Sequence, residues 1–157
     1  MVGVLGQRNS GKSYTWNMLF GHTVRTGSEI RKLYLTETQY VQVFLVSGSA
    51  EEREIYVGDI IKGKPAIVLC SIQFRNDSTR TFDWFSENNY FLFVHWLNPG
   101  WSDSSRYQDE HNISQIILDR NSLLGIRSGK TRPEERVQEM RDFIYGWAQS
   151  RNLLLSE

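Results

Sequence analysis

Hydrophobic positions along this chain fall into short apolar runs and into segments with helical spacing. Short runs rich in aliphatic, β-branched and aromatic residues predict strands at 2–5, 33–36, 40–46, 66–72, 90–97 and 123–126. Helical spacing or helix-capping residues predict helices over 12–20, around 82–85, over 104–120 and from 133 onward. This alternation of strands and helices is typical of an open α/β sheet with helices on its faces.

Two segments give the clearest structural signals. Residues 66–72 read Ala-Ile-Val-Leu-Cys-Ser-Ile, an almost continuous apolar run that indicates a central parallel strand buried on both faces. Near the C-terminus, Thr131 and Glu134 form a capping-box pattern around Pro133, and apolar residues then recur at helical spacing. We therefore expect a mostly parallel sheet, flanked by helices, in a single domain that spans residues 1–157.

The segment 40–61 is open to two interpretations. Residues 54–61 can pair with 40–46 as an antiparallel hairpin, because both stretches are rich in β-branched and aromatic residues. Alternatively, Ser49 can cap a helix with Glu52 as its capping-box partner, so that residues 50–61 are helical. The pattern slightly favours the hairpin, which is the expectation adopted for this segment.

Composition argues against some classes of function. The chain has 18 basic and 18 acidic residues, so no overall charge attracts nucleic acid or an anionic membrane, and a nucleic-acid partner is not indicated. The one cysteine, Cys70, cannot form an internal disulfide and lies in an apolar run, as expected in a reducing compartment. No apolar run approaches the length of a membrane span, and the first strand begins at once, so we expect a cytoplasmic protein without a signal peptide.

A glycine-rich loop stands between the first predicted strand and the first predicted helix. It follows the pattern G-x-x-x-x-G-K-S and consists of Gly6, Gln7, Arg8, Asn9, Ser10, Gly11, Lys12 and Ser13. Glycines let backbone N–H groups turn inward without a Cβ clash, and the start of the following helix adds further N–H donors. These donors make a concave site for an anion, and Tyr14 in the first helical turn adjoins it.

The strand, loop and helix around this Walker A pattern resemble the P-loop of P-loop nucleoside triphosphatases. The resemblance covers the first strand, the loop and the first helix, and it indicates no closer family. It implies that Lys12 reaches the β- and γ-phosphates of a nucleoside triphosphate and that the Ser13 hydroxyl contacts Mg²⁺. Residues 6–14 are then the nucleotide-binding residues, Lys12 contributes to catalysis, and the expected cofactors are ATP or GTP with Mg²⁺.

A P-loop enzyme also places a carboxylate near Mg²⁺, usually at the end of an apolar strand. Asp59 is the first candidate for this catalytic and metal-binding role, because it lies near the end of the predicted strand 54–61. Asp119 follows three aliphatic residues that look like a helix face, and Asp83 lies in a predicted helix. The most strand-like run, 66–72, carries no acid, so we expect hydrolysis to be slow.

Two further elements bear on the choice of nucleotide. In Ras-like GTPases, which this topology partly resembles, a threonine ahead of the second strand joins Mg²⁺, and Thr36 and Thr38 stand near that place. The pattern favours the alternative that both are ordinary polar residues of a strand. The chain has no Asn-Lys-x-Asp pattern for reading guanine, so ATP is favoured over GTP. Arg127, Lys130 and Arg132 follow the last strand, and they either touch phosphate or base or belong to a solvated turn.

Three functions stay open from the sequence. The first is Mg²⁺-dependent binding and slow hydrolysis of ATP by a switch or motor component, with a protein partner or second subunit that docks in part at Trp101. The second is a small P-loop kinase that transfers the γ-phosphate to a small molecule or nucleotide, with Glu51 and Glu52 just beyond a strand. The third is a Ras-like GTPase without the usual base reader.

His95, in the strand 90–97, is expected to be a packed residue and not a base.

Overall fold

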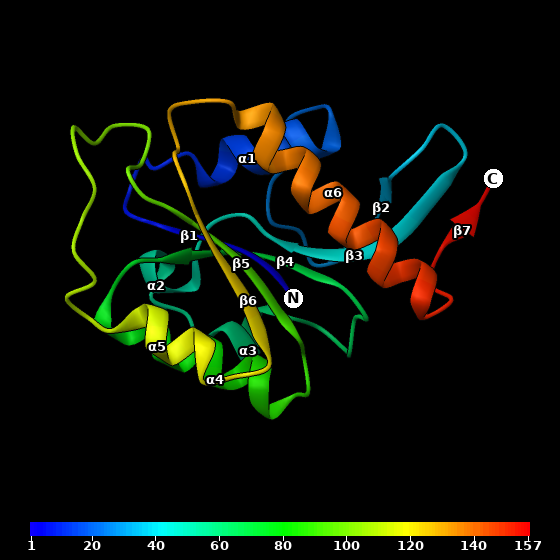
Figure 1. Cartoon of the computed structure of the whole chain (residues 1–157). Coiled ribbons are helices and arrows are strands. Elements are labelled where there is room, and N and C mark those ends of the chain that lie inside the picture. Colours follow the sequence, from blue (N-terminus) through cyan, green and yellow to red (C-terminus); the bar gives the residue numbers. More distant parts are fainter.

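The computed structural model describes all residues from 1 to 157 as one sheet with helices on both faces (Figure 1). The sheet has seven strands: β1 (Val2–Gly6), β2 (Arg31–Tyr34), β3 (Gln39–Val46), β4 (Val68–Gln73), β5 (Leu92–Leu97), β6 (Ser122–Arg127) and β7 (Leu155–Ser156). Their order in space is β2-β3-β4-β1-β5-β6, and β7 pairs with β3. The α/β class predicted from the sequence is confirmed.

Most neighbouring strands run parallel. β4 lies parallel between β3 and β1, and β5 lies parallel between β1 and β6. The pairs β2–β3 and β3–β7 are antiparallel, so the sheet is mixed at one side. Because β4 is buried along its whole length, the expectation of a central parallel strand over the apolar run is confirmed.

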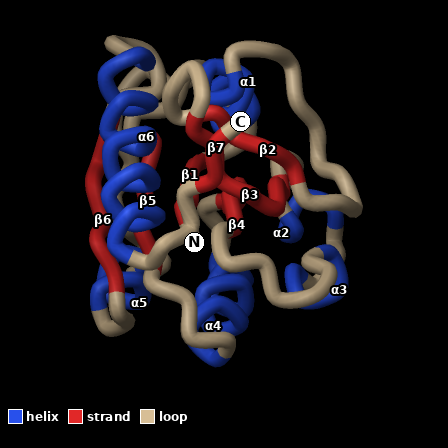
Figure 2. The backbone as a smooth tube through the Cα atoms, turned by 90° about the vertical axis from the view of Figure 1, so that its right-hand side faces the viewer, coloured by secondary structure: helices blue, strands red, loops and turns tan.

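Helices cover the sheet in two layers, and the strands lie between them in Figure 2. One face carries α1 (Lys12–Phe20) and α6 (Pro133–Ser150). The other face carries α2 (Ala50–Arg53), α3 (Val57–Ile60), the 3₁₀ turn η1 (Asn76–Ser78), α4 (Thr79–Glu87) and α5 (Ile113–Leu118). Each layer encloses its own hydrophobic core: Trp16 and Met140 pack in the first, Phe82 and Ile117 in the second.

The hairpin expected within residues 40–61 is wrong, and the helical alternative holds in part. The Ser49 hydroxyl accepts a hydrogen bond from the Glu52 N–H at 3.4 Å and so caps α2, and Val57 then opens α3 as a buried residue. A serine cap followed by two acidic residues favours a helix start, because the first N–H groups of a helix lack internal acceptors. The antiparallel hairpin of this fold is instead β2–β3.

One helix boundary and one helix cap also differ from the sequence prediction. The helix expected over 104–120 is confined to α5, because Asp109 accepts hydrogen bonds from the N–H groups of Ile113 and Ser114, at 2.8 Å each. At the start of α6, Pro133 occupies the first turn as expected. The capping box does not form, since Arg132 at the cap has a φ of 48° and no side chain accepts a bond there.

The parallel strands direct their carboxyl ends toward one edge of the sheet. The glycine-rich loop leaves β1 at this edge, and α2 and the long segment after β5 meet it there (Figure 1). In open α/β sheets ligands bind beyond this edge.

None of the helices combines the length and the apolar character needed to cross a bilayer.

Candidate nucleotide-binding site

The glycine-rich loop, residues 6–13, curls around the ammonium group of Lys12. The Lys12 Nζ donates to the Gly6 carbonyl at 3.0 Å and to the Gln7 carbonyl at 2.7 Å. Gly11 caps α1 with a φ of 104°, a left-handed conformation that glycine adopts without strain. The N–H groups at the start of α1 therefore face the edge of the sheet with no side-chain cap.

Ser10 is the packing centre of this loop. A Cβ on Gly6 would lie 2.3 Å from the Ser10 Oγ, and a Cβ on Gly129 would lie 2.3 Å from the Ser10 carbonyl oxygen. The Trp101 N–H donates to that carbonyl at 3.0 Å, so the segments after β5 and β6 both brace the loop. The Ser10 Oγ is buried and has no hydrogen-bond partner.

A pocket of about 760 Å³ opens over the glycine-rich loop. Its lining residues come from the loop and α1, from the start of α2, and from the segments after β5 and β6: Arg8, Asn9, Ser10, Gly11, Lys12, Ser13, Tyr14, Ser47, Gly48, Glu52, Trp101, Ser102, Gly129 and Pro133. The structure thus brings the predicted residues 8–14 together in one pocket. Gly6 and Gln7 lie behind it and accept from Lys12.

Lys12 carries the positive charge at the floor of this pocket. Its Nζ also donates to the Gln73 Oε1 at 3.0 Å, and only 7% of the residue is exposed. Burial lowers the pKa of Lys12 to about 8, against the opposing effect of the Glu52 and Glu51 carboxylates. The ammonium form still predominates at pH 7, so the pocket can hold an anion at its floor.

The three predicted acids do not enter the pocket. Asp59 lies exposed on α3, because its segment is helical and does not end a strand. Asp119 caps the C-terminus of α5, as its helical neighbours indicated, and Asp83 on α4 pairs with Arg120. None of these carboxylates is brought together with Ser13, and the strand-end reasoning that favoured Asp59 is therefore wrong.

Gln73 and Glu52 are the functional candidates that the motif search missed. Gln73 ends β4 and pairs in register with Gly6, which is where a strand-end acid would stand beside the loop. Glu52 lines the pocket together with Ser13, as does Trp101 on the opposite side. From the sequence, Glu52 was named only in the kinase alternative, as a residue just beyond a strand, and its capping-box pattern with Ser49 was a second signal for this edge.

The Mg²⁺ role considered for Thr36 and Thr38 is not supported by the fold. Thr36 lies in the β2–β3 turn, where its Oγ1 accepts from the Gln39 N–H at 3.0 Å, and Thr38 lies in the same turn. β3 then carries the chain to the sheet edge at which the pocket lies, so both threonines are at its far end. In the loop after α1, Thr26 stands nearer, accepting from the N–H groups of Ser47 and Gly48 at 2.8 and 3.1 Å.

The basic residues after β6 are paired with carboxylates or lie outside the pocket. Arg127 forms two hydrogen bonds with the Glu139 carboxylate, at 2.8 and 2.7 Å. Arg132 pairs with Glu135 at 3.6 Å, and neither Arg132 nor Lys130 lines the pocket. Gly129 is the one residue of this turn that reaches it, so the solvated-turn interpretation fits better.

Beneath the glycine-rich loop lies a layer of buried polar side chains between the sheet and α6. Arg136 is 2% exposed, and its Nη2 donates to the Thr15 Oγ1 at 3.1 Å. His95 on β5 is 1% exposed, with its Nε2 3.7 Å from the Glu139 carboxylate. Burial lowers the pKa of His95 to about 4, so His95 is a packed neutral residue at pH 7.

Comparisons of this chain with models of protein families, with curated proteins and with solved structures found no match. The interpretation of the site therefore rests on its own geometry. That geometry combines a buried ammonium group, uncapped helix N–H groups and a pocket large enough for a small organic anion.

Proposed function

We propose that this chain is a P-loop domain that binds a nucleoside triphosphate together with Mg²⁺ and hydrolyses it slowly. The observation that carries the proposal is the loop geometry around Lys12. The ammonium group of Lys12 and the N-terminus of α1 converge under one pocket of about 760 Å³. This is the donor set that a triphosphate requires.

Each residue has a defined task in this proposal. Lys12 exchanges one or more of its carbonyl and amide acceptors for phosphate oxygens, and the backbone N–H groups of residues 11–13 hold the phosphate chain. Ser13 is exposed at the pocket and offers a hydroxyl oxygen of the kind that Mg²⁺ binds. When bound, Mg²⁺ offsets the charge that builds up on the phosphate oxygens.

The base end of the pocket favours ATP over GTP. Trp101 is 64% exposed there, beside Gly129 and Pro133, and its ring offers a stacking face that any base can use. The acid that follows Trp101, Asp103, is already bound, since its Oδ2 accepts from the Gly100 N–H at 3.0 Å. This bond ties one oxygen of the Asp103 carboxylate to its own loop, which disfavours a role for Asp103 in reading the N–H groups of guanine.

Slow turnover is supported by the residues around the part of the pocket that would hold the terminal phosphate. β4 ends in the neutral Gln73, and Arg8 is the one arginine that lines the pocket. In P-loop proteins an arginine supplied by a partner raises the rate by about 10³–10⁵-fold. We therefore propose a switch or motor component that a partner protein or second subunit completes.

The test is to titrate ATP with Mg²⁺ into the purified chain by calorimetry and to measure steady-state phosphate release. We expect measurable binding and a kcat well below the enzyme median of about 10 s⁻¹. Absence of ATP and GTP binding would overturn the proposal. Binding with a kcat at or above that median, from a monomer alone, would overturn the claim that the site is incomplete.

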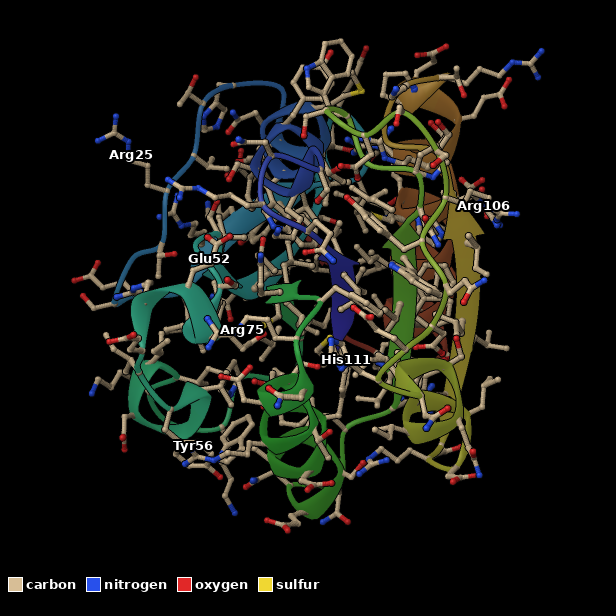
Figure 3. All side chains as sticks on the ribbon, turned by 90° about the vertical axis from the view of Figure 1, so that its left-hand side faces the viewer. Arg25, Glu52, Tyr56, Arg75, Arg106 and His111 are labelled. Atoms are coloured by element: carbon tan, nitrogen blue, oxygen red, sulfur yellow. The ribbon has the colours of Figure 1, made fainter.

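A small-molecule kinase is the second candidate, because a second hollow adjoins the first. It measures about 430 Å³ and shares Ser13, Ser47 and Gly48 with the main pocket. Arg53 lines it without an ion pair, whereas Arg25 at its rim points away from the molecule (Figure 3). An acceptor placed there would face the terminal phosphate. If the chain is a kinase, ADP forms only when an acceptor is added. The variant Arg53→Gln should then form ADP more slowly than the parent.

A further inference from the structure

The end of β4 lacks the acid that a cation beside the glycine-rich loop would need. Gln73 stands opposite Gly6 in the parallel register, and its Oε1 accepts from Lys12 at 3.0 Å. Ser71, one step earlier on the same side of the strand, accepts from the Trp16 indole at 2.8 Å. Both polar side chains of β4 are therefore neutral and already bonded to α1.

Two consecutive glutamates on α2 stand beside this strand end, and they differ in their surroundings. Glu51 is 6% exposed, and its two oxygens accept from the Gln73 N–H at 2.8 Å and from the Thr81 hydroxyl at 2.9 Å. Glu52 makes no ion pair, and its side chain accepts no hydrogen bond. It lines the pocket with Lys12 and Ser13, and Figure 3 shows it between the ribbons of α2 and α1.

The backbone of Glu52 is fixed although its carboxylate is free. Its N–H donates to the capping Ser49, while the neighbouring Glu51 side chain ties α2 to β4. Arg75 adds a hydrogen bond from its Nη1 to the Glu51 carbonyl at 3.2 Å. A fixed backbone places the Glu52 carboxylate within reach of the pocket, and only the side-chain torsions become ordered when it binds a ligand.

We propose that Glu52 supplies the carboxylate oxygen for the Mg²⁺ that accompanies the nucleotide, with the Ser13 hydroxyl as its partner ligand. This inference rests on the proposed function. Hard cations such as Mg²⁺ select oxygen ligands and use one or two carboxylates together with substrate phosphates and water. Glu52 thus takes the role that the end of β4 cannot fill.

The site makes cation binding dependent on the nucleotide. No group of three or more His, Cys, Asp or Glu side chains gathers in this structure to hold a metal ion. A single carboxylate and a hydroxyl bind Mg²⁺ weakly, and the phosphate oxygens complete the ligand set. The free chain should therefore retain little Mn²⁺, and the chain loaded with a non-hydrolysable ATP analogue should retain one ion.

The experiment compares nucleotide affinity with Mg²⁺ and with EDTA in the parent, in Glu52→Gln and in Asp59→Asn. Asp59→Asn is the matched control, because it removes one exposed carboxylate outside the pocket. In Glu52→Gln we expect the enhancement by Mg²⁺ to fall about tenfold. Affinity in EDTA should be unchanged or higher, because a negative charge near the triphosphate is gone. Mn²⁺ bound with the analogue, measured by electron paramagnetic resonance, should weaken in parallel.

The possible outcomes separate this inference from the proposed function. Equal loss of affinity with and without metal in Glu52→Gln would mean a structural role and overturn the inference, as would an unchanged Mg²⁺ effect. Loss of the Mg²⁺ effect in Gln73→Ala but not in Glu52→Gln would place the cation at β4 and also overturn it. Failure of the parent to bind nucleotide under either condition would overturn the proposed function itself.

Discussion

The floor of the pocket and its rim are built in opposite ways. On the floor, Ser10 is 1% exposed and Lys12 is 7% exposed, and the loop around them is held by backbone hydrogen bonds. On the rim, Trp101 is 64% exposed, and Glu52 is also exposed, with no partner for its carboxylate. The floor is organised before any ligand arrives, whereas the rim offers side chains that settle only in contact with one.

This difference assigns separate tasks to the two regions. In the proposed function, a preorganised floor with N–H groups and an ammonium charge would select phosphate. An exposed rim contributes less energy, because each side chain loses rotamer freedom when it becomes ordered. The rim would then decide which base and which cation are accepted, and changes there should alter selectivity more than total affinity.

Acid should affect the support of the floor most strongly. His95 has its pKa lowered to about 4, with Glu139, Arg127 and Arg136 facing it, and its unfolded value is 6.5. The unfolded chain therefore binds this proton at a higher pH, so the stability that neutral His95 contributes is full above about pH 6.5 and is lost as the pH drops toward 4. The loss from His95 is about 3 kcal/mol. Urea denaturation across this range measures it, and His95→Leu should flatten the slope.

Lys12→Ala removes the positive charge from the floor of the pocket. The variant loses a charge-assisted contact with the terminal phosphates, worth about 1.5–3 kcal/mol, so ATP affinity should fall about ten- to a hundredfold. Calorimetry measures the change, with Lys62→Ala as the control because Lys62 is exposed and lies outside the pocket. Equal ATP affinity in Lys12→Ala and the parent would contradict the role of the loop.

Trp101→Ala tests the rim at the base end. Loss of one aromatic contact should weaken ATP binding by about 0.5–1.5 kcal/mol, or roughly two- to tenfold. Trp101→Phe should restore most of the affinity, because a phenyl ring keeps a stacking face. Inorganic triphosphate, which has no base, should bind both variants as it binds the parent. A loss that is equal for ATP and for triphosphate would mean that the ring supports the floor instead.

The smallest expected effect is the choice between bases. Because Asp103 is bonded to its own loop, we expect it not to read guanine, so ATP should bind at least as tightly as GTP. Competition of both nucleotides against one fluorescent analogue decides this. A clear preference for GTP would favour the Ras-like interpretation.

The sequence predicted those elements of the fold whose signals are local. The apolar run 66–72 forms β4, and the strand, loop and helix of residues 2–20 lie where the pattern placed them. Residues 54–61 were misassigned because their β-branched residues outweighed the Ser49 cap in the pattern. The helix predicted from 104 is shortened because Asp109 bonds to backbone N–H groups that a longer helix would have used.

The candidate site divides in the same way. Residues 8–14 were identified because the motif fixes their geometry within a few residues of chain. Glu52, Gln73 and Trp101 were not assigned to the pocket, since their positions depend on the register of β4 against β1 and on the path of the segment after β5. Such relations join residues far apart in the sequence, and no local pattern records them.

The contact of the segment after β5 with Ser10 sets where this chain tolerates inserted sequence. Gly129 donates to the Pro99 carbonyl at 2.7 Å, and a Cβ on Gly100 would meet the Ser10 side chain at 2.7 Å. An extra residue between Pro99 and Trp101 would therefore displace the glycine-rich loop. Between Ser104 and Ser105, both exposed and without hydrogen bonds, a peptide tag or a reporter domain can enter while the loop keeps its shape.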